Sequence, residues 1–258
     1  MKKVISVILS LIILTCSLSV AASAASVLGI NSYGSTLDLI KEDERLDSNF
    51  GTVVENKGII GSNYATVEKN TGTIEYQYSG LVNNYAGGTI TNSYSASTVY
   101  NYGGTVEHFI DGTIYNYGGT INNCYAGTVY NFGGTILKNY VENVTEYKKV
   151  TLDLSNAEAD GFTENDGELW LVQNDGTAVI KPLEGYRFED APTVSPDSAT
   201  LLENEDGSFT VSNVTEDITI TAKAVSSAEG DEGQSHLVAF TEILIMFLTL
   251  LSYFLMTL

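Results

Sequence analysis

Residues 98–142 read TVYNYGGTVEHFIDG, TIYNYGGTINNCYAG and TVYNFGGTILKNYVE, three lines of fifteen residues that begin at Thr98, Thr113 and Thr128. Each line splits into a half of seven and a half of eight residues, and both halves open with Thr followed by Val or Ile. A fixed short period of this kind is typical of a solenoid, in which no unit buries its own apolar face and each coil completes its neighbour. The repeat therefore predicts a stack of coils with two strands in each.

The same frame extends towards the N-terminus, with small insertions near Gly87 and Ser95. Twelve halves make about six coils over residues 51–144. The second position of each half is always β-branched, which suits a pleated surface, whereas Gly, Asn, Ser and Ala gather where the halves meet. We therefore expect an all-β, two-sheet β-solenoid with parallel strands, and its inward ladders consist of Val53, Ile60, Val67, Ile74, Val82, Ile90, Val99, Val106, Ile114, Ile121, Val129 and Ile136.

Two columns of residues follow the inward position in the last three coils. The first column is aromatic, and strict alternation places it on the outside of the sheet. The second column is Asn and is expected to stack at the bend, where amides bond to one another and to turn backbone. Both columns are candidate binding residues: Tyr100, Tyr115, Tyr130, Asn101, Asn116 and Asn131. The alternative is that stacked tyrosines only stabilise a short sheet through cross-strand contacts.

Further aromatic residues stand near the ends of most halves, as at Tyr64, Tyr78, Tyr102 and Tyr117. Because the turn breaks the alternation, two placements stay open for these rings. They either close the narrow core from its ends or stand outside it.

The chain is acidic, with a formal net charge of -20 from 12 Lys and Arg against 32 Asp and Glu. Such a field disfavours contact with nucleic acid and with anionic lipid surfaces. Lys2 and Lys3 precede an apolar run that ends in Ala-Ser-Ala at residues 22–24, which predicts a secretory signal peptide over residues 1–24. Cys124 is then the single cysteine of the mature chain, so no internal disulfide is expected.

Residues 25–50 precede the first recognised coil and are interpreted as an N-terminal cap. An open solenoid end exposes unpaired strand edges and apolar ladder atoms, so a covering segment is expected there. Residues 36–46 read TLDLIKEDERL, with apolar side chains on one side and charges elsewhere. This pattern favours a short helix or an irregular segment.

Residues 145–225 lose the fifteen-residue period and resemble a series of short strands separated by turns. Hairpin-type turn signals occur at Asp166-Gly167, Asp175-Gly176 and Asp206-Gly207. Trp170, the single tryptophan, is expected in the core. The pattern predicts a small all-β module.

Two segments of this module, EGYRFEDAP from Glu184 and DGSFTVSNVTEDITITAKA from Asp206, carry a family resemblance. They resemble the small all-β repeat modules of Gram-positive surface proteins, in the pattern of the internalin B-repeat. The solenoid is similar, by pattern, to those of bacterial surface and adhesin-like proteins. The resemblance implies a β-sandwich or β-grasp-like spacer or adhesion module without catalysis.

Residues 226–236 are small and acidic and are expected to form a linker. Residues 237–258 are apolar except for Glu242 and a few hydroxyl residues, and these twenty-two residues suffice to span a bilayer. We therefore expect a transmembrane helix that holds the protein at the extracellular face of the cell membrane. A GPI signal is the alternative, because the small residues 226–228, a polar spacer and an apolar tail match that pattern as well.

The sequence holds few ingredients for catalysis. His108 and His236 are its two histidines, and no nucleophile-elbow, HExxH, CxxC or P-loop pattern occurs. We therefore expect no enzyme, no metal-binding residue and no cofactor. The leading hypothesis is a surface-anchored adhesion, display or structural protein that presents a Tyr, Asn and Thr face to a glycan or a protein. The alternatives are a self-assembling, fibre-forming surface protein and an ice-binding protein, although Thr-x-Thr does not recur from coil to coil.

Overall fold

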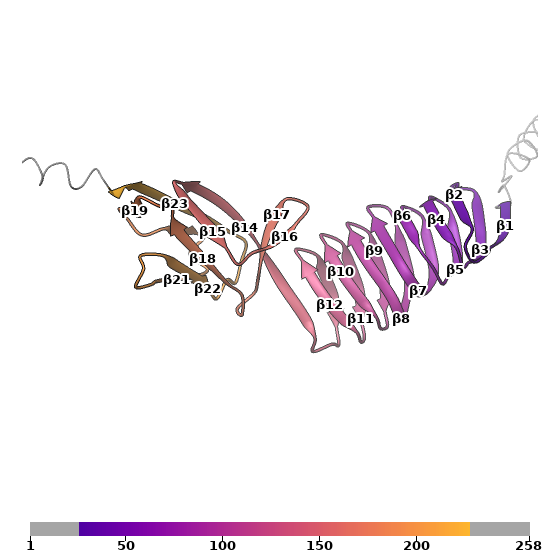
Figure 1. The fold of residues 1–258 in the computed structure, drawn as a ribbon. Coiled ribbons are helices and arrows are strands. Elements are labelled where there is room, and N and C mark those ends of the chain that lie inside the picture. Colours follow the sequence, from indigo (N-terminus) through magenta and orange to yellow (C-terminus); the bar gives the residue numbers. More distant parts are fainter. Residues whose placement is uncertain (1–25, 228–258) are drawn as a thin grey trace, which may run out of the picture. The chain divides into compact units, whose positions relative to one another are not determined.

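The computed structural model describes residues 26–227, and every regular element in this range is a β-strand (Figure 1). The chain divides into two compact units, Met1–Thr145 and Glu146–Leu258, and each is described by itself. Residues 26–227 contain no helix with the length and apolar character that crossing a membrane requires. The predicted signal peptide, the predicted transmembrane helix and most of the predicted linker lie outside the described residues.

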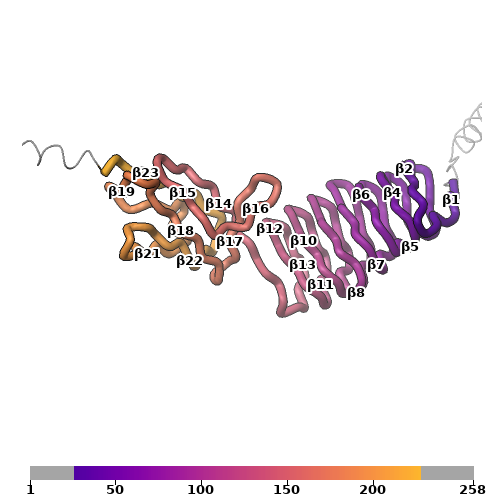
Figure 2. The backbone as a smooth tube through the Cα atoms, in the orientation of Figure 1, coloured from indigo at the N-terminus to yellow at the C-terminus, as the bar shows by residue number. Residues whose placement is uncertain are grey.

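The first unit is a β-solenoid in which strands of successive coils pair in parallel, and Figure 2 shows the coils following one another. The first sheet stacks β1 (Ser26–Asn31), β3 (Glu44–Asn49), β5 (Ile59–Asn63), the first part of β7 (Thr73–Tyr85), the first part of β8 (Thr89–Tyr102), β9 (Thr105–Phe109), β11 (Thr120–Cys124) and β13 (Thr135–Asn139). The second sheet stacks β2 (Thr36–Ile40), β4 (Thr52–Asn56), β6 (Val67–Asn70), the last parts of β7 and β8, β10 (Thr113–Tyr117) and β12 (Thr128–Phe132). The solenoid therefore has about eight turns.

The predicted number of six coils is too small, because residues 26–49 belong to the solenoid. Leu37 pairs with Val53 and Leu46 pairs with Ile60, so both continue the inward ladders. The short helix or irregular segment expected over residues 36–46 is wrong. Pairing with the growing sheet outweighs the helical preference of the charged residues in this segment.

The core is the predicted stack of β-branched side chains. Eleven of the twelve predicted ladder residues have no exposed surface, and Ile136 in the last coil is partly buried against the same cluster. Ile40 and Leu46 extend the cluster towards the N-terminus. Burying each side chain contributes about 1.5–3 kcal/mol before chain entropy is subtracted. The inward ladder is therefore confirmed and longer than predicted.

A row of asparagine side chains runs inside the corner at the end of the second sheet. Each side-chain amide donates a hydrogen bond to the side-chain oxygen of the next residue in the row, at 2.7–2.9 Å, in the order Asn56, Asn70, Asn84, Asn101, Asn116 and Asn131. A shorter row at the end of the first sheet connects Asn31, Asn49, Asn63 and Gln77. All of these side chains are buried. Since a buried amide costs free energy unless it is hydrogen-bonded, the rows fix the register of each coil on the next.

The Asn-x-Gly-Gly phrase of the repeat fits this row. Asn116 has two amide hydrogens; one bonds to Asn131, and the other is available for the backbone oxygen of Gly119 at 3.1 Å. Gly118 has a φ of 71°, which glycine adopts without strain. At Gly119, a Cβ would overlap the side-chain amide of Asn101. The first glycine therefore turns the chain, and the second leaves room for the amide row.

The asparagine row should contribute strongly to stability. We expect Asn116→Ala to lower the free energy of unfolding by about 3 kcal/mol, because it leaves buried groups of its neighbours without hydrogen bonds. Asn122→Ala, which removes a half-buried amide that donates to Glu107, should cost about 0.5 kcal/mol or less. Chemical denaturation of the two variants measures both losses. Equal losses would show that the row does not hold the coils together.

The second unit is also all β. One group of strands contains β14 (Val144–Ser155), which pairs in parallel with β23 (Ile218–Ser226), and the antiparallel strands β16 (Thr163–Asn165), β17 (Glu168–Val172), β19 (Tyr186–Phe188) and β20 (Thr193–Ser195). A separate antiparallel sheet has the order β15 (Ala157–Asp160), β18 (Thr177–Pro182), β22 (Phe209–Ser212) and β21 (Thr200–Glu203). The buried cluster of this unit consists of Val150, Leu171, Ala178, Ile180, Val211, Val214, Ile218, Ile220 and Ala222.

The turns of the second unit test the hairpin signals. Asp166-Gly167 joins β16 to β17 and Asp206-Gly207 joins β21 to β22, and both pairs of strands are antiparallel, as predicted. Asp175-Gly176 lies between β17 and β18, which belong to different sheets, so the hairpin expected there is wrong. A turn signal marks the change of chain direction but does not specify the strand that pairs next. Trp170 is buried, as predicted.

Candidate binding surface

The outer side of the second sheet carries the predicted tyrosine column. Val99 and Asn101 of β8 point inwards and are buried, so Tyr100 between them points outwards. The register pairs Tyr100 with Tyr115 and Tyr115 with Tyr130. All three rings are half-buried and lie outside the core, so the predicted outward placement is confirmed.

A second column of rings lies beside the first on the same sheet. Tyr102 faces outwards two residues after Tyr100, and the two ring centroids are 6.4 Å apart. This column stacks Tyr85 on Tyr102 at 5.2 Å and Tyr102 on Tyr117 at 5.1 Å. We call the two columns together the tyrosine face, which consists of Tyr100, Tyr115, Tyr130, Tyr85, Tyr102 and Tyr117.

The rings of the tyrosine face stack on one another along the solenoid. Centroids in the first column are 4.9 Å apart, with interplanar angles of 8° between Tyr100 and Tyr115 and 14° between Tyr115 and Tyr130. Because neighbouring rings cover both faces of Tyr115, that side chain offers its rim and its hydroxyl to the outside. The tyrosine face is therefore a grid of ring rims and phenol groups with the repeat distance of the strands.

The predicted asparagine column has a different location from the tyrosines. Asn101, Asn116 and Asn131 stack at the bend and bond to one another and to turn backbone, as expected. Their exposed fractions are 0%, 0% and 4%, however, so their side chains point into the corner. A ligand on this sheet would contact the tyrosines and not these amides. The amides act by holding the coils in register.

Another aromatic column, absent from the predicted site, follows the corner at the end of the first sheet. Phe50, Tyr64, Tyr78 and Tyr94 stack with centroids 4.8–5.0 Å apart, and Tyr64 is 40% exposed. Most rings near the ends of the halves therefore stack outside the core, with Phe109 and Phe132 as buried exceptions. The signal in the sequence was an aromatic residue at this position in most coils, but the direction of its side chain depended on the turn.

Charged side chains occupy other parts of the solenoid surface. On the second sheet, Glu55 of β4 pairs with Lys69 of β6 at 2.8 Å. On the first sheet, Arg45 donates two hydrogen bonds of 2.8 Å to Glu75, and the hydrogen bond from Arg45 holds the pKa of Glu75 below its usual value. The tyrosine face, in contrast, consists only of tyrosine side chains and contains no charged residue. Burial, followed by the neighbouring phenols, raises the pKa of Tyr115 above its usual value.

The groups that could carry catalysis in the solenoid do not converge. Asn123 lies 3.3 Å from His108 Nδ1, and Glu107 accepts a hydrogen bond from Asn122. Cys124 is fully buried, and burial raises the pKa of its thiol to about 11. A reactive cysteine needs the opposite, a lowered pKa and access to solvent. Within residues 26–227, no three His, Cys, Asp or Glu side chains are grouped so that they could hold a metal ion.

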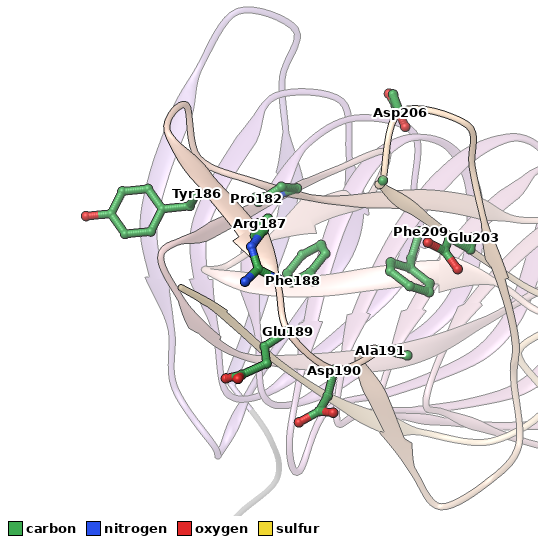
Figure 3. Close-up of a pocket in the computed structure, with 11 residues that line it drawn as sticks. Pro182, Tyr186, Arg187, Phe188, Glu189, Asp190, Ala191, Glu203, Asp206 and Phe209 are labelled. Atoms are coloured by element: carbon green, nitrogen blue, oxygen red, sulfur yellow. The ribbon is translucent and has the colours of Figure 1, made fainter. Parts of the chain in front are cut away.

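The second unit has a pocket of about 290 Å³, drawn in Figure 3. Phe188 and Phe209 meet edge to face beside it, with centroids 5.7 Å apart. Glu203 and Asp206 also line it, but Asp206 accepts hydrogen bonds from the backbone and hydroxyl of Ser208 and so caps its own turn. The residues that line this pocket include no His, Ser, Cys or Lys.

Cys124 should be unreactive in the folded protein. We expect iodoacetamide at pH 8 to leave the native thiol unmodified and to alkylate it fully after denaturation, because the folded thiol is both buried and protonated. Mass spectrometry of the two samples measures the modification. Rapid alkylation of the native protein would show that the coil around β11 opens or that the thiol is activated.

No protein-family model, no curated protein and no solved structure matches the chain. The resemblance of the second unit to Gram-positive surface modules therefore stays a prediction.

Proposed function

We propose that this chain is a surface-anchored, non-enzymatic adhesion or display protein whose solenoid presents the tyrosine face to an extracellular glycan or protein. The observation that carries the proposal is the tyrosine face itself. Six tyrosines stand in two columns at fixed spacing on one sheet, outside the core. Tyrosine is enriched where proteins bind, because it combines a large apolar ring with a polar hydroxyl.

The rigidity of the solenoid supports this proposal. The asparagine rows and the β-branched ladder hold successive coils in register, and the stacked rings restrain one another. Binding to a pre-ordered surface avoids the cost of immobilising side chains, which is about 0.5–1.5 kcal/mol for each flexible side chain. A tyrosine grid of this kind loses little conformational freedom when a ligand binds.

The remaining parts of the chain fit the same proposal. The second unit would serve as a small β-sandwich spacer, in line with its resemblance to surface modules. Residues 237–258 would hold the chain at the extracellular face of the membrane, as a transmembrane helix or as a GPI signal. A signal peptide over residues 1–24 would direct export.

Self-assembly is the second candidate function, and one observation favours it. Among the described strands, β1 pairs with β3 and has no strand on its other side. Val27 and Ile30 of β1 are 61% and 65% exposed. Open strand edges with apolar side chains can pair with another chain, so coils could continue from one molecule to the next. Ice binding, the third candidate, has no comparable support, because the aligned threonines Thr98, Thr113 and Thr128 of the second sheet are each followed by an outward tyrosine and not by a second threonine.

Replacing the first tyrosine column should weaken ligand binding. We expect the triple variant Tyr100→Ala, Tyr115→Ala and Tyr130→Ala to bind its ligands at least about tenfold more weakly, because buried tyrosines dominate binding energies. A glycan array and a panel of extracellular proteins, probed with both forms, measure the change. Tyr76→Ala is the matched control, since Tyr76 is an exposed tyrosine on the first sheet.

The two folded proteins must first be shown to have the same circular dichroism. Unchanged binding by the triple variant would contradict the proposed site. Activity of the wild-type protein as a hydrolase would contradict the proposed class of function.

A further inference from the structure

We propose that the tyrosine face binds the same face of a second copy of this chain, so that two solenoids pack side by side with their second sheets towards each other. This inference rests on the proposed function, because it names the partner of the same surface. It differs from assembly through the open edge of β1, which would join coils end to end.

The stacking of the rings decides what the tyrosine face can bind. Tyr115 is covered on both faces by Tyr100 and Tyr130, at 4.9 Å on each side. A ligand that stacks flat on an aromatic ring therefore finds no free ring face in the middle of the column. Ring rims and hydroxyls remain, and these pack against the rims and hydroxyls of other aromatic side chains. An edge-to-face contact between rings is one of the preferred aromatic arrangements.

The charge of the chain points to the same surface. Two copies, each with a formal net charge of -20, repel one another, so a contact between them is favoured where the surface carries no charge. The outward side chains of β10 are uncharged, namely Thr113, Tyr115 and Tyr117, and the same positions of β8 and β12 hold Thr, Tyr or Phe. Two copies can thus meet at the tyrosine face without bringing like charges into contact.

The repeat distance of the face selects a partner with the same repeat. Rings along the column are 4.9 Å apart, which is the separation of neighbouring strands. A partner without this repeat would match the grid at one or two positions. A second solenoid of the same sequence matches it at every coil, as do the facing sheets of cross-β structures.

The symmetry and the area of the contact predict its strength. A face that binds itself forms a two-fold pair, which closes at two copies and does not extend into a fibre. Three coils of five-residue strands cover roughly 240 Å², from a strand spacing of about 4.8 Å and a rise of about 3.3 Å per residue. A stable interface needs about 800 Å² on each partner. One pair is therefore weak, and many pairs between two crowded surfaces hold through multivalency.

Beads coated with the full-length protein test this inference. We expect wild-type beads to cluster, whereas beads that carry Tyr115→Glu and beads that carry Tyr115→Lys each cluster at least about tenfold less, because like charges meet at the centre of the contact. A mixture of the Glu and Lys beads should cluster again, because opposite charges then face each other. Light scattering follows the clusters, and circular dichroism checks that both variants are folded.

Tyr76→Glu and Tyr76→Lys are the matched controls on the first sheet, and their beads should cluster as the wild type does. Wild-type beads that stay single would overturn the inference, and so would folded Glu and Lys variants that fail to cluster when mixed. The wild-type beads could stay single while the protein still binds a glycan or another protein through Tyr100, Tyr115 and Tyr130. That result would refute only the self-contact and would leave the proposed function standing. Clustering that survives both charged variants would also refute it, and would point to the edge of β1.

Discussion

The hydrogen bond from one asparagine side chain to the next, repeated from coil to coil, is the interaction on which the rest of the solenoid depends. An apolar ladder alone would tolerate small shifts of one coil against its neighbour, because the hydrophobic effect has no direction. A row of buried amides resists such a shift, because moving one coil against the next would break the hydrogen bonds between its members. Asn56 Oδ1, where the row begins, is buried without a hydrogen-bond partner among the described residues. The row from Asn56 to Asn131 therefore sets the register, and the glycine that follows each bend, such as Gly119, provides the space that the row requires.

Register inside the solenoid determines the surface outside it. Once Val99, Ile114 and Val129 are aligned, the alternation of the strands aligns the tyrosines that follow them, and the strand spacing becomes the ring spacing. The rings then stack on one another, so flat faces within each column are covered by neighbouring rings. The ring rims and the hydroxyl groups stay exposed to solvent. The proposed contacts with other molecules follow from this geometry. The same geometry explains why the asparagines stabilise the face from inside but do not belong to it.

The sequence was sufficient for the features that repeat within strands. The β-branched residue in each half predicted the inward ladder, and the next position predicted the outward Tyr100, Tyr115 and Tyr130. Features at corners were not predictable, because a turn breaks the alternation; the burial of Asn116 and the outward stacking of Tyr64 are examples. The first coils were missed for another reason. Residues 36–46 are rich in charge, and local composition suggested a helix, although Leu37 and Leu46 occupy ladder positions that pairing with the next coil decides.

The exchange rate of the Asn116 side-chain amide hydrogens tests the central role of the asparagine row most directly. Nuclear magnetic resonance can follow these hydrogens in deuterated solvent and compare them with those of Asn122, which is half-buried on the outside of β11. If the row exists as described, the Asn116 amide exchanges orders of magnitude more slowly than the Asn122 amide, because its hydrogens become accessible only when coils separate. Equal, rapid exchange at both residues would contradict the account.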